Sequence, residues 1–195
     1  MKIWASQIEL SLHSFEAILD AACRLQRIDR VLFVVPLKKY GKKWQPYNKA
    51  ILRYLDRRLR RYAVDMFLAS AWPGSELTKH CGMVIILEYC DHLRSILLET
   101  EERLSDWTRY NKPPLPEDLC FFTNGASYPA FMSCTHEGEG WLLSSQESHM
   151  LHARPVQVDL REMFVFEGRY YCKAQRNQGI PIAFRSLVKN RTQLR

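Results

Sequence analysis

Three stretches of the chain repeat apolar residues at the three- and four-residue spacing of an amphipathic helix. These stretches are residues 6–27, 46–62 and 91–107. The first repeat runs from Ile8 to Leu25, and Pro46 suits the first position of the second helix. The third stretch carries acidic residues such as Glu99 on its outer side. The pattern therefore predicts three main helices.

Short apolar runs, rich in β-branched and aromatic residues, lie between these stretches and predict strands. The two most apolar runs are Val31–Leu37, in which Pro36 is expected to mark the exit, and Gly82–Cys90. Further strands are predicted at residues 65–72, 119–123, 130–135 and 141–145, with a hairpin at 162–172. The capping-box spacing of Ser144 and Glu147 predicts a short helix that continues to residue 152.

The order of these elements indicates the fold class. Helices and strands are interspersed without a regular strand–helix–strand alternation, which favours the α+β class with a mixed or mainly antiparallel sheet. A chain of 195 residues is long enough to bury one core. We therefore expect a single compact domain at residues 1–172, with a possible subdomain break at the proline-rich connector 111–117, and a basic tail at 173–195.

Charge is segregated along the chain, whose net charge is +7. Residues 38–61 hold ten Lys/Arg and one Asp, and residues 173–195 hold six Lys/Arg and no acid. The middle of the chain, residues 62–172, holds sixteen Asp/Glu against eight Lys/Arg. Two basic blocks around an acidic middle suggest a surface with separate basic and acidic regions. Such regions favour binding of a charged partner.

The first basic block is the strongest candidate for a binding surface, because a lysine-rich loop precedes a helix with basic residues opposite its apolar face. The predicted partner-binding residues are Lys38, Lys39, Lys42, Lys43, Trp44, Tyr47, Lys49, Arg53, Arg57, Arg60 and Arg61. Arginine binds both carboxylates and phosphates, so a protein and a nucleic acid are both open as partners. The alternative is a solvated helix face, partly neutralised by the acidic helix at 91–107. Exposed ion pairs contribute only about 0.2–1 kcal/mol each, which does not explain why the charge is concentrated.

One segment has the residue types of a catalytic site. Cys134, His136 and Glu137 follow a predicted strand and precede glycines, and they could serve as nucleophile, base and acid. Alternation along a strand places residues 134 and 136 on one face, whereas Glu137 points away unless a turn intervenes. The alternative is a hairpin with a packed cysteine and a polar turn.

Two Cys-x-His pairs also raise the possibility of a metal site. They are Cys90 with His92 and Cys134 with His136. Zinc prefers four converging ligands, often from Cys-x-x-Cys pairs, and this spacing is tighter. Neutral histidines at element ends beside core thiols are the alternative. No glycine-rich phosphate-binding motif is present, so no cofactor is predicted.

The six cysteines include no Cys-x-x-Cys pair and most lie in apolar runs, which favours reduced, buried thiols. The first thirteen residues lack the apolar core of a secretion signal, and no apolar run reaches the length of a membrane span. These features predict a cytoplasmic protein that does not associate with a membrane.

The segregated charge, together with the lack of a clear catalytic motif, favours a non-catalytic binding protein. We expect it to recognise a protein partner, possibly acidic, through the basic helix. In general type it resembles bacterial immunity, antitoxin and adaptor proteins, a resemblance that implies no residue roles. The alternative is a nucleic-acid-associated accessory protein that uses the same helix and the basic tail. A Cys/His enzyme or a zinc protein is the third hypothesis.

Overall fold

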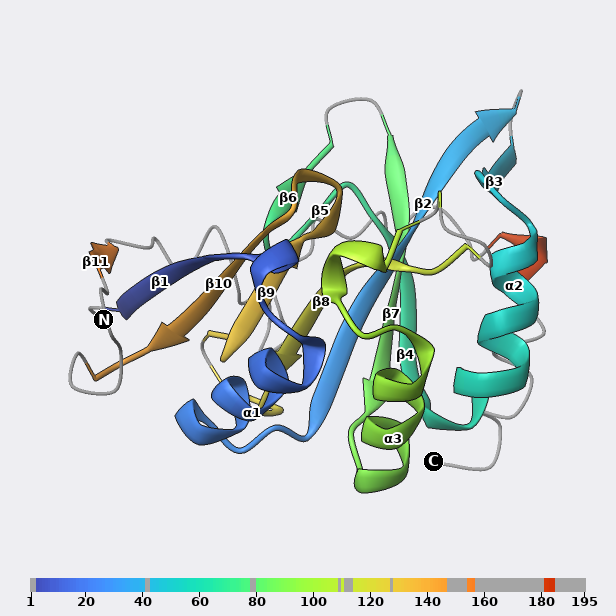
Figure 1. Cartoon of the computed structure of the whole chain (residues 1–195). Helices are drawn as coiled ribbons and strands as arrows, with labels where there is room; N and C mark the ends of the chain where they lie inside the picture. Colours follow the sequence, from blue (N-terminus) through green and yellow to red (C-terminus); the bar gives the residue numbers. More distant parts are fainter. Residues whose placement is uncertain are drawn as a thin grey trace.

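A large antiparallel sheet forms the centre of the fold (Figure 1). The computed structural model describes residues 3–40, 43–77, 80–108, 110, 114–126, 128–146, 154–156 and 181–184. The sheet strands are β1 (Ile3–Glu9), β2 (Arg30–Tyr40), β3 (Lys43–Pro46), β4 (Ala63–Ala69), β7 (Cys81–Glu88), β8 (Glu117–Phe122), β9 (Phe131–Cys134), β10 (Glu139–Ser144) and β11 (Arg154–Val156). Their order is β11-β1-β10-β9-β8-β2-β7-β4, and β3 pairs with β2. The α+β prediction is thereby confirmed, with one compact domain.

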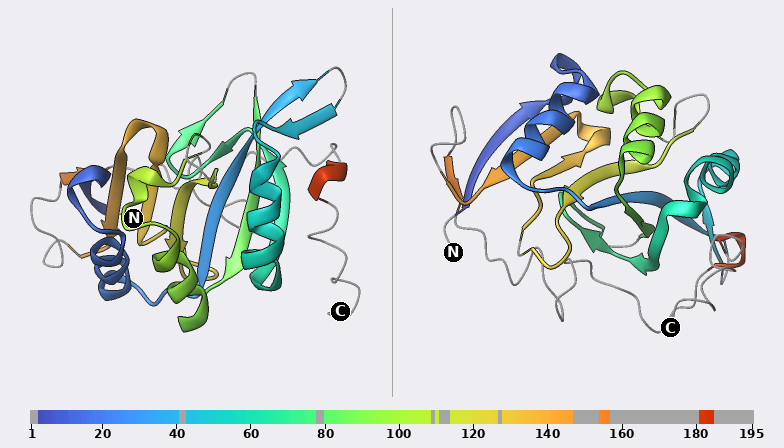
Figure 2. Two further views of the ribbon diagram at one scale, coloured as in Figure 1. Left: turned by 45° about the vertical axis from the view of Figure 1, so that its right-hand side comes forward. Right: turned by 90° about the horizontal axis from the view of Figure 1, so that it is seen from below.

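Three helices lie on one face of this sheet (Figure 2). They are α1 (Phe15–Leu25), α2 (Ala50–Tyr54) and α3 (Asp91–Thr100). Helix α2 continues as a π-helical turn, Leu55–Leu59, and a 3-10 turn, Arg60–Tyr62. We call residues 50–62 the α2 segment. None of the helices described is both long and apolar enough to cross a membrane.

Alternation along the central strand β2 divides the core between the two faces of the sheet. Val31, Phe33 and Val35 pack into the cluster beneath the helices, whereas Leu32 and Val34 pack into a smaller cluster on the opposite face. A two-stranded hairpin joins β5 (Ala71–Trp72) to β6 (Ser75–Glu76), and Trp72 belongs to the smaller cluster. Both faces of the central strands are therefore buried.

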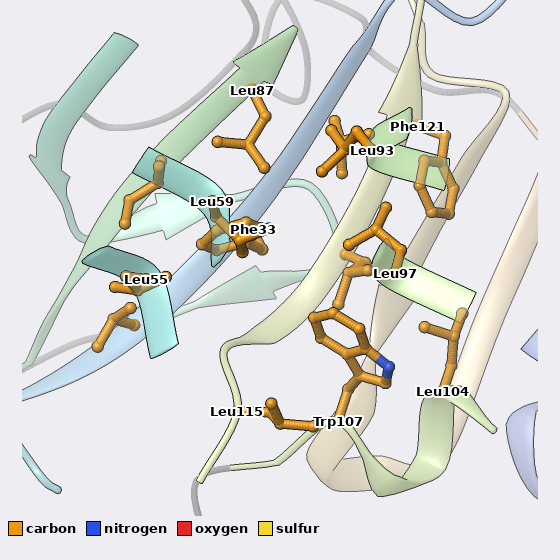
Figure 3. Packing of buried hydrophobic residues seen from close by; sticks show 14 of the residues in the cluster. Phe33, Leu55, Leu59, Leu87, Leu93, Leu97, Leu104, Trp107, Leu115 and Phe121 are labelled. Atoms are coloured by element: carbon orange, nitrogen blue, oxygen red, sulfur yellow. The ribbon is translucent and has the colours of Figure 1, made fainter. Parts of the chain in front are cut away.

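The indole of Trp107 is the largest fully buried side chain beneath the helices (Figure 3). Its ring packs edge-on against Phe15 of α1, with 5.8 Å between centroids, and against Tyr54 of α2, with 6.3 Å. Tyr54 also forms a 2.9 Å hydrogen bond with the hydroxyl of Thr100 at the end of α3. One aromatic cluster thus fixes all three helices relative to one another.

The structure corrects the first predicted helix. Residues Ile3–Glu9 form strand β1, which pairs with β10 and β11, and the helix begins only at Phe15. The hydroxyl of Ser14 accepts a 3.2 Å hydrogen bond from the Ala17 amide and caps the helix. Pairing with two distant strands determines the conformation of residues 3–9, and a local pattern does not contain that information.

The other two predicted helices form over shorter ranges. Pro46 ends β3, and the α2 segment begins at Ala50, whose amide donates to the Asn48 side chain. Helix α3 ends at Thr100, and a separate 3-10 turn, Leu104–Asp106, leads to the core tryptophan.

Pro36 does not end its strand. It lies within β2, between the last pairing of that strand with β8, at Val34, and the first pairing with β3, at Leu37. Because Pro36 falls between these pairings on that side of the strand, its missing N–H does not interrupt either ladder.

The second half of the chain supplies strands β8, β9, β10 and β11 of the sheet. The predicted strands at 119–123, 130–135 and 141–145 are confirmed as β8, β9 and β10. Residues 114–116 lead into β8, which pairs with β2, so elements on both sides of the proline-rich connector share one sheet. Most of the predicted short helix, the hairpin at 162–172 and most of the basic tail lie outside the described residues.

Candidate functional site

The α2 segment divides its basic residues between two sides. Its apolar residues, Ile51, Leu55 and Leu59, are buried against the sheet. On the side next to α3, a guanidinium nitrogen of Arg58 lies 3.0 Å from a carboxylate oxygen of Glu99, so the basic and acidic helices are neighbours.

Two further arginines of the segment have partners. Arg60 pairs with Asp56 one turn earlier at 3.2 Å, and Arg61 contacts the imidazole of His92 on α3. The charge of the segment is therefore partly neutralised by the same chain.

Three exposed cations, Lys49 immediately before the α2 segment and Arg53 and Arg57 within it, follow one another at four-residue intervals. A four-residue spacing keeps these side chains on one side of the helix. None of them forms an ion pair or side-chain hydrogen bond with the described residues. We call these three residues the basic stripe.

The preceding β2–β3 hairpin spreads its charges over both sides of the sheet. Lys39 and Trp44 are opposite each other, and the Lys39 ammonium lies 5.6 Å from the centre of the indole. Trp44 is partly buried and packs against the main core. Lys38 and Lys43 are exposed at positions that alternate with Lys39 and Trp44. Lys42 lies outside the described residues.

A second group of polar residues gathers around the buried carboxylate of Asp118, at the start of β8 and on the sheet face opposite the helices. One oxygen, Oδ2, accepts hydrogen bonds from Trp72 Nε1 at 2.8 Å and Ser75 Oγ at 3.0 Å, both in the β5–β6 hairpin. The other, Oδ1, accepts from the Thr135 amide at 2.9 Å and, more weakly, from its hydroxyl at 3.3 Å. Asp118 therefore connects three segments that are far apart in the sequence.

The backbone around Asp118 adopts conformations that few residues tolerate. Asp118 has φ of +54°, the left-handed region, which aspartate enters more readily than most residues. Gly74, in the β5–β6 turn, has φ of +91°, and a Cβ there would lie 2.9 Å from the carbonyl oxygen of Ser133 in β9. This close approach of the hairpin to β9 requires glycine and brings Ser75 to the carboxylate.

Cys134 and His136 flank Thr135 and complete this group, which we call the Asp118 cluster. Cys134 Sγ lies 3.6 Å from Nδ1 and 3.7 Å from Nε2 of His136, and 3.5 Å from Ser75 Oγ. His136 Nδ1 lies 3.9 Å from Asp118 Oδ1, and the side chain is 40% exposed. The cluster thus has a buried base and one member that reaches solvent.

Electrostatics in the cluster do not favour a reactive cysteine. Burial raises the pKa of the Cys134 thiol to about 11, and the Asp118 carboxylate adds to the shift. The same carboxylate raises the pKa of His136. Because the thiolate is the nucleophilic form of cysteine, a raised pKa works against covalent catalysis at Cys134.

The other candidate residues occupy different positions. Glu137 lies in the turn after β9, and its carboxylate is 3.9 Å from His136 Nε2, so the turn does bring it near the pair. Cys90 and His92 lie at the start of α3, where both are exposed and His92 contacts Arg61. Among the described residues, the Cys90/His92 pair forms no cluster with a third metal-binding side chain.

Sequence reasoning missed Asp118, Trp72 and Ser75. A usable signal was present, because Glu117 and Asp118 directly precede a run of apolar residues that forms a fully buried strand. An acid at the start of such a strand needs hydrogen-bond partners. The partners come from residues 72–75, and only the folded chain identifies them.

Comparison with protein-family models, curated proteins and solved structures finds no match for this chain.

Proposed function

We propose that this chain is a non-catalytic binding protein, of the immunity, antitoxin or adaptor type, that recognises an acidic protein through the basic stripe. The observation that carries the proposal is that Lys49, Arg53 and Arg57 are exposed on one side of a packed helical segment without an ion pair among the described residues. Charges held by a rigid element speed association with a partner of opposite sign and orient it.

The contrast within the α2 segment supports this proposal. Arg58, Arg60 and Arg61 already have side-chain partners within the chain. The stripe has no such partner in the described residues. We therefore place Arg60 and Arg61 at the margin of the binding surface and the stripe at its centre.

The aromatic residue best placed to contact a partner is Tyr47, which is 46% exposed and lies two residues before Lys49. Tyrosine beside arginine is typical of the residues that contribute most to binding at interfaces. Trp44 is held between Lys39 and the core, and it supports the hairpin from within. Lys38, Lys39 and Lys43 extend the positive field around this surface.

The thiols support a reducing location. Cys23, Cys81, Cys90 and Cys134 carry free thiols. Because free thiols are typical of reducing compartments, we propose that the protein acts in the cytoplasm.

A charge-reversal comparison tests the proposal. The probes are a labelled glutamate-rich peptide and labelled single- and double-stranded oligonucleotides, titrated with the full chain at several salt concentrations. The double variant Arg53→Glu/Arg57→Glu reverses two of the three charges of the stripe. The double variant Arg24→Glu/Arg27→Glu changes net charge equally at exposed positions on and after helix α1 and serves as the control.

We expect the peptide to bind the parent chain and to lose about tenfold or more in affinity only when the stripe is reversed. Equal losses in both variants would mean that net charge alone attracts the peptide, and the proposal would then fail. Absence of peptide binding at low salt would also reject it. Tighter binding of oligonucleotides, with an affinity that falls steeply with salt, would replace it with the nucleic-acid alternative.

A further inference from the structure

The Asp118 cluster brings together three different metal-binding atoms. Asp118 offers a carboxylate oxygen, Cys134 a sulfur and His136 a ring nitrogen, and these atoms all lie within 4.8 Å of one another. Asp118 and Cys134 are buried, with exposed fractions of 2% and 3%. The group thus has a fixed inner side and, at His136, an outer side open to solvent.

The spacing of these atoms is close to that of ligands around zinc. With bonds of about 2.3 Å to sulfur and about 2.0–2.2 Å to nitrogen or oxygen, tetrahedral zinc separates its ligand atoms by roughly 3.3–3.6 Å. Cys134 Sγ lies 3.6 Å from His136 Nδ1, which lies 3.9 Å from Asp118 Oδ1. These two separations are within a few tenths of an ångström of the ligand spacing, and the third, between the sulfur and the carboxylate, is at most 4.8 Å. Zinc binding therefore requires the three side chains to close around the ion by about an ångström or less.

The surroundings hold the carboxylate in place for such a role. Trp72 and Ser75 both donate to Oδ2, and the Thr135 amide donates to Oδ1. Ligating carboxylates in metal sites are commonly oriented by such hydrogen bonds. The remaining contact of Oδ1, with the Thr135 hydroxyl, is the longest of the four at 3.3 Å. A metal ion that binds Oδ1 therefore needs to displace no more than this weakest of the four hydrogen bonds.

We propose that Asp118, Cys134 and His136 form a binding site for Zn²⁺, with solvent as the fourth ligand. The thiol loses its proton to solvent when the sulfur–zinc bond forms. Carboxylate and thiolate then balance the double charge of the ion, so the buried side of the site carries no net charge. The mixed sulfur, nitrogen and oxygen donors suit zinc better than Mg²⁺ or Ca²⁺, which prefer oxygen alone.

One side chain must move for the ion to bind. The two ring nitrogens of His136 lie at 3.6 and 3.7 Å from the sulfur, so the imidazole is side-on to it. Binding requires the ring to turn one nitrogen towards the ion. The 40% exposure of this side chain is consistent with such a rotation.

Metal titration of the reduced, chelator-treated full chain tests the site. Zn²⁺ is titrated in competition with a weak indicator chelator, and Co²⁺ is used as a spectroscopic probe of thiolate ligation. His136→Ala and Cys134→Ser remove single ligands without touching the Asp118 hydrogen bonds. The matched control is Cys90→Ser/His92→Ala, which removes the other Cys-x-His pair.

We expect one zinc ion per chain, a thiolate-to-cobalt charge-transfer band, and a loss of about tenfold or more in affinity in either ligand variant. The control variant should bind as the parent does. Binding too weak to compete with the indicator would overturn the proposal. Undiminished binding in both ligand variants, or loss of binding in the control, would also overturn it, because the ion would then be held elsewhere.

Discussion

The Asp118 cluster and the α2 segment both concentrate polar chemistry, but they arrange it in opposite ways. In the cluster, donors from two distant segments converge on one carboxylate that is 2% exposed. Along the α2 segment, the cations diverge from one helix, and the stripe has no ion-pair partner among the described residues.

This difference separates polar groups that specify the fold from those available for binding. A buried polar group must be satisfied within the protein, because an unpaired one costs about 1–3 kcal/mol. An exposed charge is satisfied by water at little cost, so its position is free to serve another molecule. We therefore expect substitutions in the cluster to change stability most, and substitutions in the stripe to change binding with little effect on stability.

Removal of the central carboxylate should have the largest effect. Asp118→Ala leaves Trp72 Nε1, Ser75 Oγ and the Thr135 amide without their acceptor, and it places alanine at φ of +54°. We expect a loss of about 3–5 kcal/mol in the free energy of unfolding, measured by urea denaturation. Arg57→Ala, on the stripe, should change the same quantity by less than about 0.5 kcal/mol. Similar losses in the two variants would contradict the contrast between the regions.

The next largest effect should come from the turn that brings Ser75 to the cluster. Gly74→Ala places a Cβ 2.9 Å from the Ser133 carbonyl oxygen at φ of +91°. Gly125→Ala is a matched control, since Gly125 has φ of +83° but no atom within 4 Å of the corresponding Cβ position. We expect Gly74→Ala to cost about 1–3 kcal/mol and to exceed the control, because only Gly74 combines backbone strain with a collision. Equal thermal stability of the two variants would show that the hairpin does not need its close approach to β9.

The inner side of the α2 segment should behave like the buried region. Burial raises the pKa of Tyr54 to about 12, and its hydroxyl bonds to Thr100. The folded state therefore disfavours the ionised phenol, so the stabilising contribution of Tyr54 is complete below the ordinary tyrosine pKa of about 10 and is lost as the pH rises towards 12. Tyr54→Phe should cost about 1 kcal/mol near neutral pH, through the lost hydrogen bond. The free energy of unfolding of the Tyr54→Phe variant should then fall less steeply than that of the parent between about pH 10 and 12. Parallel urea-unfolding curves for the two chains over that range would contradict this prediction.

The sequence predicts the two regions to different extents for a physical reason. Helical periodicity indicates the α2 segment, and a two-residue spacing is enough to suggest that Cys134 and His136 lie together. Asp118 and Ser75 are separated by 43 residues and meet only through strand pairing and a turn. Local patterns report which face of an element a residue occupies, but they do not report which distant element covers that face.

The same limit applies to the charge pattern, because a count of charged residues does not show which of them have partners. Counting residues shows a basic and an acidic block, and it does not show that Arg58 lies beside Glu99 while Arg53 and Arg57 have no ion-pair partner among the described residues. Geometry thus selects three residues from the eleven that the sequence proposes as a binding surface.

The smallest predicted effect concerns the ion pair that joins the two charged helices. Arg58 and Glu99 are 45% and 64% exposed, and their closest atoms are 3.0 Å apart. A double-mutant cycle with Arg58→Gln and Glu99→Gln should give a coupling energy of about 0.2–1 kcal/mol that decreases with added salt, because water and ions screen the pair. Such a value would mean that even the paired side of the α2 segment contributes little to folding. A coupling above about 2 kcal/mol that does not change with salt would contradict this prediction. It would mean that the charges on the side next to α3 stabilise the fold, whereas those of the stripe do not.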